Sequence, residues 1–256
     1  MRLQRKPRRH THPCQSALPL KNLGLPNTLD EFYTGKLPKA FRIMDILCVA
    51  DLHGEIQAKQ FLFEFIKKSR PDAIILAGDV TCGSVSFAED LFEELDRTRI
   101  PYYAVHGNND PETVQDFFEE THRDLAGKKT IIGQIPFYGL GGSGPTPFNT
   151  VCEYTEETIE RKLAELKVPD DGKFILVSHT PPRDCAADKT GHGNHVGSRS
   201  LREFVLAKKP AVVVCGHVHE QHLSEKLGDT IIAKAGTLMH KKALVLTIPE
   251  NKVTLL

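Results

Sequence analysis

From residue 42 onward, the chain alternates between short, almost wholly apolar runs and longer segments in which apolar residues recur every three or four positions. Short apolar runs bounded by turn residues are typical of buried strands, and the periodic segments are typical of amphipathic helices. The pattern predicts strands at 43–50, 72–77 and 101–105, with helices at 61–70 and 85–97 between them. Apolar strands that alternate with helices indicate βαβ units, whose parallel strands are covered on both faces.

The second half of the chain follows the same pattern less regularly. It predicts helices at 111–122, 155–167 and 200–208, and strands at 130–132, 135–140, 173–178 and 211–215. The polar, glycine-containing stretches 141–147 and 181–198 are expected to be loops. Alternating apolar and polar positions in the tail predict antiparallel strands at 230–233, 243–247 and 253–255.

Composition narrows the class of protein. With 256 residues, 40% of them hydrophobic and 26% charged, the chain can form a soluble globular domain with a sizeable core. Its formal net charge of zero argues against a protein that binds long nucleic acid or an anionic membrane by electrostatic attraction. The six cysteines are scattered without a Cys-x-x-Cys pair, which favours reduced thiols and a cytoplasmic location, and no run is long enough to cross a bilayer. The oligomeric state is left open.

The first forty residues differ from the rest. Six Lys or Arg residues precede the first acidic residue, Asp30, four prolines interrupt any helix, and there is no apolar run of the kind found in secretory signals. We predict that residues 1–41 are a basic, poorly structured extension, with a basic arm or an organelle address as the alternative. Residues 42–256 are then one domain.

Five of the predicted strands end in side chains that bind metals. These side chains are carboxylates, imidazoles and one amide, the ligand set of divalent Mn, Fe and Zn. Each motif alone also fits an ordinary turn, because Asp and Asn favour turns. Their repetition at the same end of successive strands predicts instead a dinuclear metal site, since ligands bind at the carboxyl ends of strands in α/β sheets. The motifs are Asp51-x-His53, Gly78-Asp79, Gly107-Asn108-Asn109-Asp110, His179 and Gly216-His217-x-His219.

Local geometry can also be anticipated. In an extended segment residues two apart point the same way, so Asp51 with His53, and His217 with His219, are each expected to face one site. The glycines in or beside these motifs, at positions 54, 78, 107 and 216, fit tight turns or close approach of the backbone, with Gly54 expected to pass close to the cluster.

The order of the five motifs resembles that of the calcineurin-like metallophosphoesterase superfamily, over about residues 43–243. Thr180-Pro181-Pro182 and His195-Val196-Gly197-Ser198 look like the small prokaryotic phosphoesterase branch related to cyclic-nucleotide phosphodiesterases. The resemblance implies an α/β fold, a four-layer αββα sandwich with two mixed β-sheets face to face and the metal site at the carboxyl ends of their strands.

The resemblance also implies how the ligands divide. One metal would take Asp51, His53 and His219, the other Asn108, His179 and His217, and Asp79 would bridge them. The cofactors would be two divalent metal ions, with Mn²⁺ favoured and Fe or Zn possible. A hydroxide bridging the metals would attack a phosphate ester in line.

One residue departs from the family pattern. The position of Asn109 is commonly a histidine that helps the leaving group depart, and an amide cannot donate a proton as an imidazolium can. Some small prokaryotic members also lack this histidine. We expect either good leaving groups or a second histidine to make up for this loss. His195 and His192 are the candidates, although both fit a solvated loop as well. Asn108, Asn109 and His195 are the expected substrate-binding residues.

Three functions are compatible with these residues. A phosphodiesterase acting on small diesters is favoured. A phosphomonoesterase or nucleotide phosphatase is the first alternative, because specificity would lie in the loops at 141–150 and 181–198. The second is a non-catalytic metal-binding scaffold, which the complete set of seven ligands disfavours.

Overall fold

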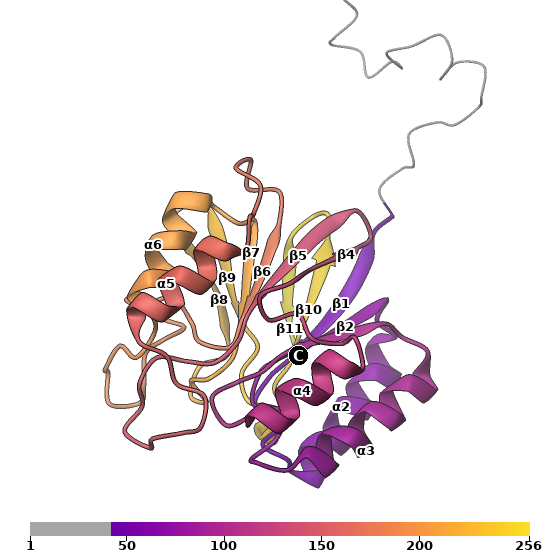
Figure 1. Cartoon of the computed structure of the whole chain (residues 1–256). Coiled ribbons are helices and arrows are strands. Elements are labelled where there is room, and N and C mark those ends of the chain that lie inside the picture. The colour runs from indigo at the N-terminus through magenta and orange to yellow at the C-terminus, as the bar shows by residue number, and fades with distance from the viewer. Residues whose placement is uncertain (1–41) are drawn as a thin grey trace, which may run out of the picture. The chain divides into compact units, whose positions relative to one another are not determined.

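The computed structural model describes residues 42–256, and Figure 1 shows its arrangement. The prediction for residues 1–41 lies outside the described residues. Within the described part, no helix combines the length and apolar character needed to cross a membrane.

The first sheet has five strands in the order β11-β10-β1-β2-β3. Strands β1, β2 and β3 are parallel, β10 runs antiparallel to β1, and β11 runs antiparallel to β10. The bounds are β1 Met44–Val49, β2 Ala73–Ala77, β3 Tyr102–Val105, β10 Leu244–Ile248 and β11 Lys252–Leu255.

The second sheet has six strands in the order β4-β5-β6-β7-β9-β8. Its four inner strands are parallel, while β4 and β8 are antiparallel edges. The bounds are β4 Lys129–Ile132, β5 Ile135–Leu140, β6 Ile175–Ser178, β7 Val212–Cys215, β8 Leu223–Leu227 and β9 Thr230–Lys234.

The tail departs from the prediction of antiparallel strands in one respect. Strand β9 is antiparallel to β8 but parallel to β7, and β10 and β11 belong to the other sheet. The reason is β8, which the alternation did not identify: the chain runs out along this edge strand, turns at Gly228 with φ +62°, and returns parallel to β7.

Helices cover the outer face of each sheet (Figure 1). Helices α2 (Ile56–Ser69), α3 (Val85–Thr98) and α4 (Glu112–Glu120) pack on the first sheet, and α5 (Glu156–Glu165) and α6 (Arg199–Lys208) pack on the second. A one-turn 3₁₀ helix, η1, spans Leu238–His240.

The two sheets bury a shared core. Alternate residues of β1 and β2, such as Cys48 and Ile75, point toward Phe137, Val177 and Val214 of the second sheet. The remaining residues of the same strands face the helices, so the strands are apolar on both faces, as expected for covered parallel sheets. The predicted four-layer αββα sandwich with two mixed sheets is therefore confirmed.

Candidate metal centre

The turns after β1, β2 and β7 place ligand residues in left-handed backbone conformations. The φ angles are 56° at Asp51, 52° at His53, 49° at Asp79 and 77° at His217. Asp51, His53 and His217 are therefore not in extended segments, so the alternation assumed from the sequence is absent. Asp51 and His53 nevertheless belong to one converging group of ligand atoms, as expected. A non-glycine residue in this region costs of order 1–3 kcal/mol, and such residues cluster at functional sites.

At two of the glycines, a ligand side chain lies so close to the backbone that no other residue would fit. A Cβ at Gly78 would lie 2.3 Å from Nδ1 of His179, and a Cβ at Gly107 would lie 2.0 Å from Oδ1 of Asp79. Any side chain at either position would displace a ligand residue. Gly54 differs from the expectation: its φ is +70°, but the nearest atom to its Cβ position is the backbone N of Cys82 at 3.6 Å, outside the ligand cluster.

Asp51, His53 and His219 form one group of converging ligand atoms, which all lie within 4.8 Å of one another. Nε2 of His53 lies 3.0 Å from Nε2 of His219, and Oδ1 of Asp51 lies 3.6 Å from Nε2 of His219. This is the trio that the resemblance implies for one metal.

A second group contains Asp51, Asp79 and His179. Oδ2 of Asp79 lies 3.4 Å from Nε2 of His179 and 3.7 Å from Nε2 of His53. Oδ1 of Asn108 lies 2.9 Å from Nε2 of His179. Asp79 therefore lies between the two imidazoles that the resemblance assigns to different metals.

His217 contacts this cluster in another way. Its backbone N–H donates to both carboxylate oxygens of Asp51 at 3.1 Å, and its ring packs edge-on against that of His179 with centroids 5.0 Å apart. Neither converging group of the described residues includes its ring nitrogens.

The histidine tautomer at the centre is set by the backbone. Nδ1 of His179 lies 3.0 Å from the carbonyl oxygen of Ala77 and can only donate to it, so the lone pair is on Nε2, facing the cluster, when the ring is neutral. Such a bond to the far nitrogen is the usual support of a metal-binding histidine.

Opposite charges in the cluster stabilise one another. Burial would raise the pKa of Asp79, but His179 and His53 hold it below its ordinary value. Burial would lower the pKa of His179, but Asp79 outweighs it and raises that pKa to about 9. The buried carboxylates thus retain a proton on His179 that a divalent cation would release.

A buried lysine adjoins the site. Lys234 is fully buried, its ammonium donates to the carbonyl oxygen of Gly216, and its charge helps to lower the pKa of Asp51. Burial lowers the pKa of Lys234 itself. Sequence reasoning missed this residue because it lies within a strand and outside every motif.

The donor set fits divalent metals. Two buried carboxylates, three imidazoles and one amide oxygen converge at the ends of strands from both sheets, with the ring of His217 packed against that of His179. These atoms are ligands of Mn, Fe and Zn rather than of Ca, which prefers oxygen alone.

Asp110, which follows Asn109, has a structural role. The fully buried carboxylate accepts hydrogen bonds from the backbone N–H groups of Gly107, Val80 and Thr81 and from the Thr81 hydroxyl. It thereby ties the turn after β3 to the turn after β2, which carries Asp79.

His195 forms a dyad with a buried aspartate. Its Nδ1 lies 2.6 Å from Oδ1 of Asp188, which is fully buried and also accepts from the backbone N–H groups of Cys185 and Gly197. The His195 side chain is 35% exposed, and His192 is exposed. Sequence reasoning missed Asp188, because a single aspartate in a polar loop carries no periodic or motif signal.

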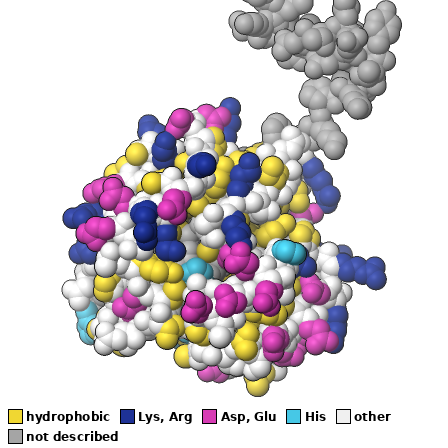
Figure 2. Space-filling view, viewed as in Figure 1, with side chains coloured by type: hydrophobic (Ala, Val, Ile, Leu, Met, Phe, Trp, Pro, Cys, Tyr) yellow, Lys and Arg dark blue, Asp and Glu magenta, His cyan; other side chains and the backbone are white. Residues whose placement is uncertain are grey.

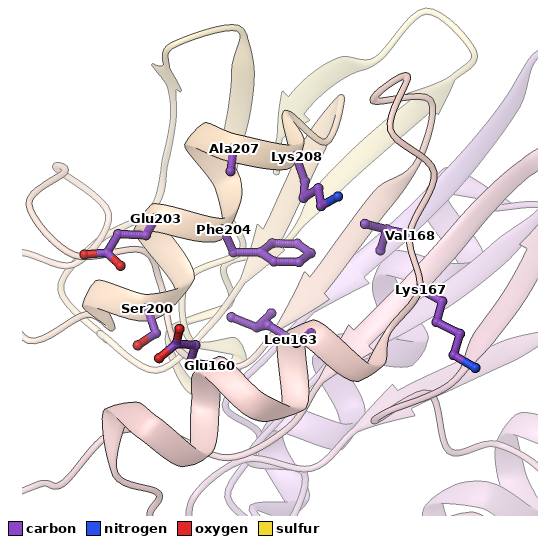
Figure 3. Close-up of a pocket in the computed structure, with 10 residues that line it drawn as sticks. Glu160, Leu163, Lys167, Val168, Ser200, Glu203, Phe204, Ala207 and Lys208 are labelled. Carbon is purple, nitrogen blue, oxygen red and sulfur yellow. The ribbon is translucent and has the colours of Figure 1, made fainter.

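A groove of about 350 Å³ lies away from these residues, between α5 and α6 (Figure 3). Its apolar floor includes Leu163, Val168 and Phe204, with Lys167 and Lys208 at its rim. None of the candidate ligands lines it.

Residues 44–221 match the family described as calcineurin-like phosphoesterase, so the chain belongs to this family of metal-dependent phosphoesterases. The resemblance drawn from the five motifs is confirmed.

Two relatives illustrate the breadth of the family. The chain is 33% identical over 220 residues to the uncharacterised protein MJ1162 of Methanocaldococcus jannaschii, covering 84% of this chain and 96% of the relative. It is 27% identical over 201 residues to GpdQ of Arcobacter nitrofigilis, named a probable glycerophosphodiester phosphodiesterase, covering 73% of this chain and 67% of the relative.

Solved structures share the fold. The protein TT1561 of Thermus thermophilus aligns with a TM-score of 0.67 at 19% identity, covering 84% of this chain and 98% of that one. A dimetal phosphatase from Danio rerio aligns with a TM-score of 0.53 at 11% identity, covering 83% and 98%.

Proposed function

We propose that this protein is a dinuclear-metal phosphoesterase that hydrolyses small phosphodiesters. The observation that carries the proposal is the convergence of Asp51, Asp79, His53, His179 and His219, whose ligand atoms form two overlapping groups within 4.8 Å. Membership of a phosphoesterase family supports the reaction class.

The proposed ligands are divided as the family pattern implies. Asp51, His53 and His219 hold one ion, Asn108, His179 and His217 hold the other, and Asp79 is shared. Two divalent ions, Mn²⁺ favoured, would activate water for attack on phosphorus and offset charge on the phosphoryl oxygens. Support for a shared Asp79 comes from its position within 4 Å of both His53 and His179.

A small diester is favoured as substrate by two observations. The chain is similar to a protein named as a probable glycerophosphodiester phosphodiesterase. The face seen in Figure 2 carries acidic side chains over α3 and α4, which would repel the backbone of a long nucleic acid passing over them. The cytoplasmic location and the boundary at residue 41 stay predictions from the sequence.

The chain's own residues must supply the proton for the leaving group. Asn109 can donate hydrogen bonds and, with Asn108, contact the substrate, but its amide holds no transferable proton at neutral pH. His195 is the proposed donor, because Asp188 fixes its Nδ1 and orients the ring. An aspartate that orients the ring of a catalytic histidine in this way is a known arrangement in hydrolases.

The proposal is tested by hydrolysis of bis- and mono-p-nitrophenyl phosphate after metal-stripped protein is reloaded with Mn²⁺. We expect two bound ions per chain and turnover of the diester above the monoester. Preferred turnover of the monoester would indicate a phosphatase instead. Two bound ions without turnover of either compound would indicate a scaffold.

The shared ligand is tested separately. Asp79→Asn should abolish turnover and weaken the binding of both ions, measured as metal content after dialysis. Asp116→Asn, which changes an exposed carboxylate on α4, is the matched control. Full activity of Asp79→Asn would refute the shared-ligand assignment.

A further inference from the structure

The two ends of the Asn108 side chain have different neighbours. Its Oδ1 lies 2.9 Å from Nε2 of His179, and its Nδ2 donates to Oγ1 of Thr150 at 3.0 Å. A metal ion can bind only the oxygen of an amide, so rotating this side chain by half a turn would replace a ligand with an NH₂ group. The orientation of the amide therefore matters for the metal site.

The orientation is imposed from outside the metal cluster. Oγ1 of Thr150 donates to Oε1 of Glu153 at 2.5 Å. An ionised carboxylate can only accept, so the Thr150 hydroxyl must give its proton to Glu153 and offer a lone pair to Asn108. Only the NH₂ end of the amide can use that lone pair, which leaves Oδ1 facing His179.

Glu153 is well suited to remain ionised. It accepts four hydrogen bonds, from the backbone N–H and the hydroxyl of both Thr146 and Thr150. Burial would raise its pKa, but these bonds outweigh burial and lower the pKa to about 2. The carboxylate thus acts as an acceptor throughout the physiological range of pH.

The same loop is also bonded to the backbone of Asn108. The N–H of Cys152 donates to the Asn108 carbonyl oxygen at 3.0 Å, so backbone and side chain of Asn108 are both held by the segment 150–153. Sequence reasoning placed Thr150 at the end of the specificity loop 141–150 and assigned the segment 150–153 no role at the metal site.

We propose that Thr150 and Glu153 are positioning residues, which turn the amide oxygen of Asn108 toward His179 and thereby set the affinity for one of the two metal ions. The inference rests on the proposed dinuclear function. It adds that substitution of either residue lowers the affinity for one of the two metal ions selectively, although neither residue is itself a metal ligand.

The chain contains a matched control. Thr146 donates its hydroxyl to the same oxygen of Glu153 at 2.5 Å, as Thr150 does, but has no bond to Asn108. Thr146→Val therefore removes the same hydroxyl bond to Glu153 as Thr150→Val, and also the bond that the Thr146 hydroxyl accepts from the N–H of Phe148, while leaving the amide contact in place. Thr150→Ser keeps the hydroxyl and should behave as the wild type.

The experiment is calorimetric titration of Mn²⁺ into metal-stripped protein, with the thermal midpoint of each metal-free variant recorded alongside. Loss of a residue that supports a metal ligand costs about 10–100-fold in affinity. We expect Thr150→Val and Glu153→Gln to lose about that factor at one of two sites, with Thr146→Val and Thr150→Ser unchanged.

The outcomes are distinguishable. Equal affinity of Thr150→Val and wild type at both sites would overturn the inference, as would an equal loss in Thr146→Val, which would trace the effect to the loop as a whole. If Thr150→Val fails to fold, Glu153→Gln decides between the same outcomes. Wild-type protein that binds no Mn²⁺ would instead contradict the proposed function.

Discussion

Asn109 holds both carboxylate oxygens of Asp79: its backbone N–H donates to Oδ1 at 2.8 Å and its side-chain amide donates to Oδ2 at 2.7 Å. In the family pattern that the motif resembles, the position of Asn109 is a histidine. Here the residue secures the proposed shared ligand, and His195 is the proposed donor of the proton for the leaving group.

Asn109→His should restore a proton donor beside the site. General-acid help contributes up to about 10²–10⁴-fold and matters most for poor leaving groups. We expect kcat/KM for a phenyl diester to rise by about tenfold relative to that for a p-nitrophenyl diester. An equal change for both esters would show that Asn109 affects the site only through Asp79.

His195→Ala should remove the decrease in rate at high pH that a general acid produces in the pH–rate profile. The loss should be about 10²-fold for a phenyl diester and smaller for a p-nitrophenyl diester, because the better leaving group needs less protonation. His192→Ala, which alters an exposed histidine of the same loop, serves as the control. A profile that His195→Ala leaves unaltered would rule out this residue as the proton donor.

Asp110→Asn should destabilise the fold rather than alter the chemistry directly. Three of the four hydrogen bonds that the carboxylate accepts come from backbone N–H groups, so an NH₂ group in place of either oxygen would leave at least one N–H donor without an acceptor. Leaving such buried donors unpaired costs about 2–3 kcal/mol. Urea unfolding of the metal-free protein measures this, and a cost equal to that of Asp116→Asn would contradict the role assigned to Asp110.

Glu156 should make the stability of the α5–α6 pair dependent on pH. It accepts from the backbone N–H groups of Ser200 and Arg199 and from the Ser198 hydroxyl at the start of α6. Burial would raise the pKa of Glu156, but these bonds outweigh it and hold the pKa below the ordinary 4.5. The stabilisation is therefore complete above about pH 4.5 and is lost as the pH falls through the lower, folded-state pKa.

The measurement compares Glu156→Gln with wild type by urea unfolding between pH 4 and 8. The difference in unfolding free energy should be constant above about pH 5.5 and shrink toward pH 4. Glu160→Gln, which alters an exposed carboxylate one turn further along α5, should show no such trend. A difference that grows as the pH falls would contradict the assigned direction.

Much of the fold follows from the sequence because its signals are local. The apolar runs at 43–50, 72–77 and 211–215 become β1, β2 and β7, since only buried strands accommodate side chains that are apolar on both faces. The direction of β9 could not be predicted in this way. Its parallel pairing depends on β8, an edge strand whose mixed polarity gives little periodic signal.

For the candidate site, the sequence by itself determined which residues end the strands, and therefore the donor chemistry at Asp51, Asp79 and His179. Tertiary structure decided how they meet: left-handed backbone at Asp51 and Asp79, the Asp188 bond that orients His195, and the Thr150–Glu153 contact that turns Asn108. The physical reason is that the identity of a ligand is a property of one residue. Its orientation depends on hydrogen bonds from residues distant in the chain, such as Thr150, 42 positions from Asn108.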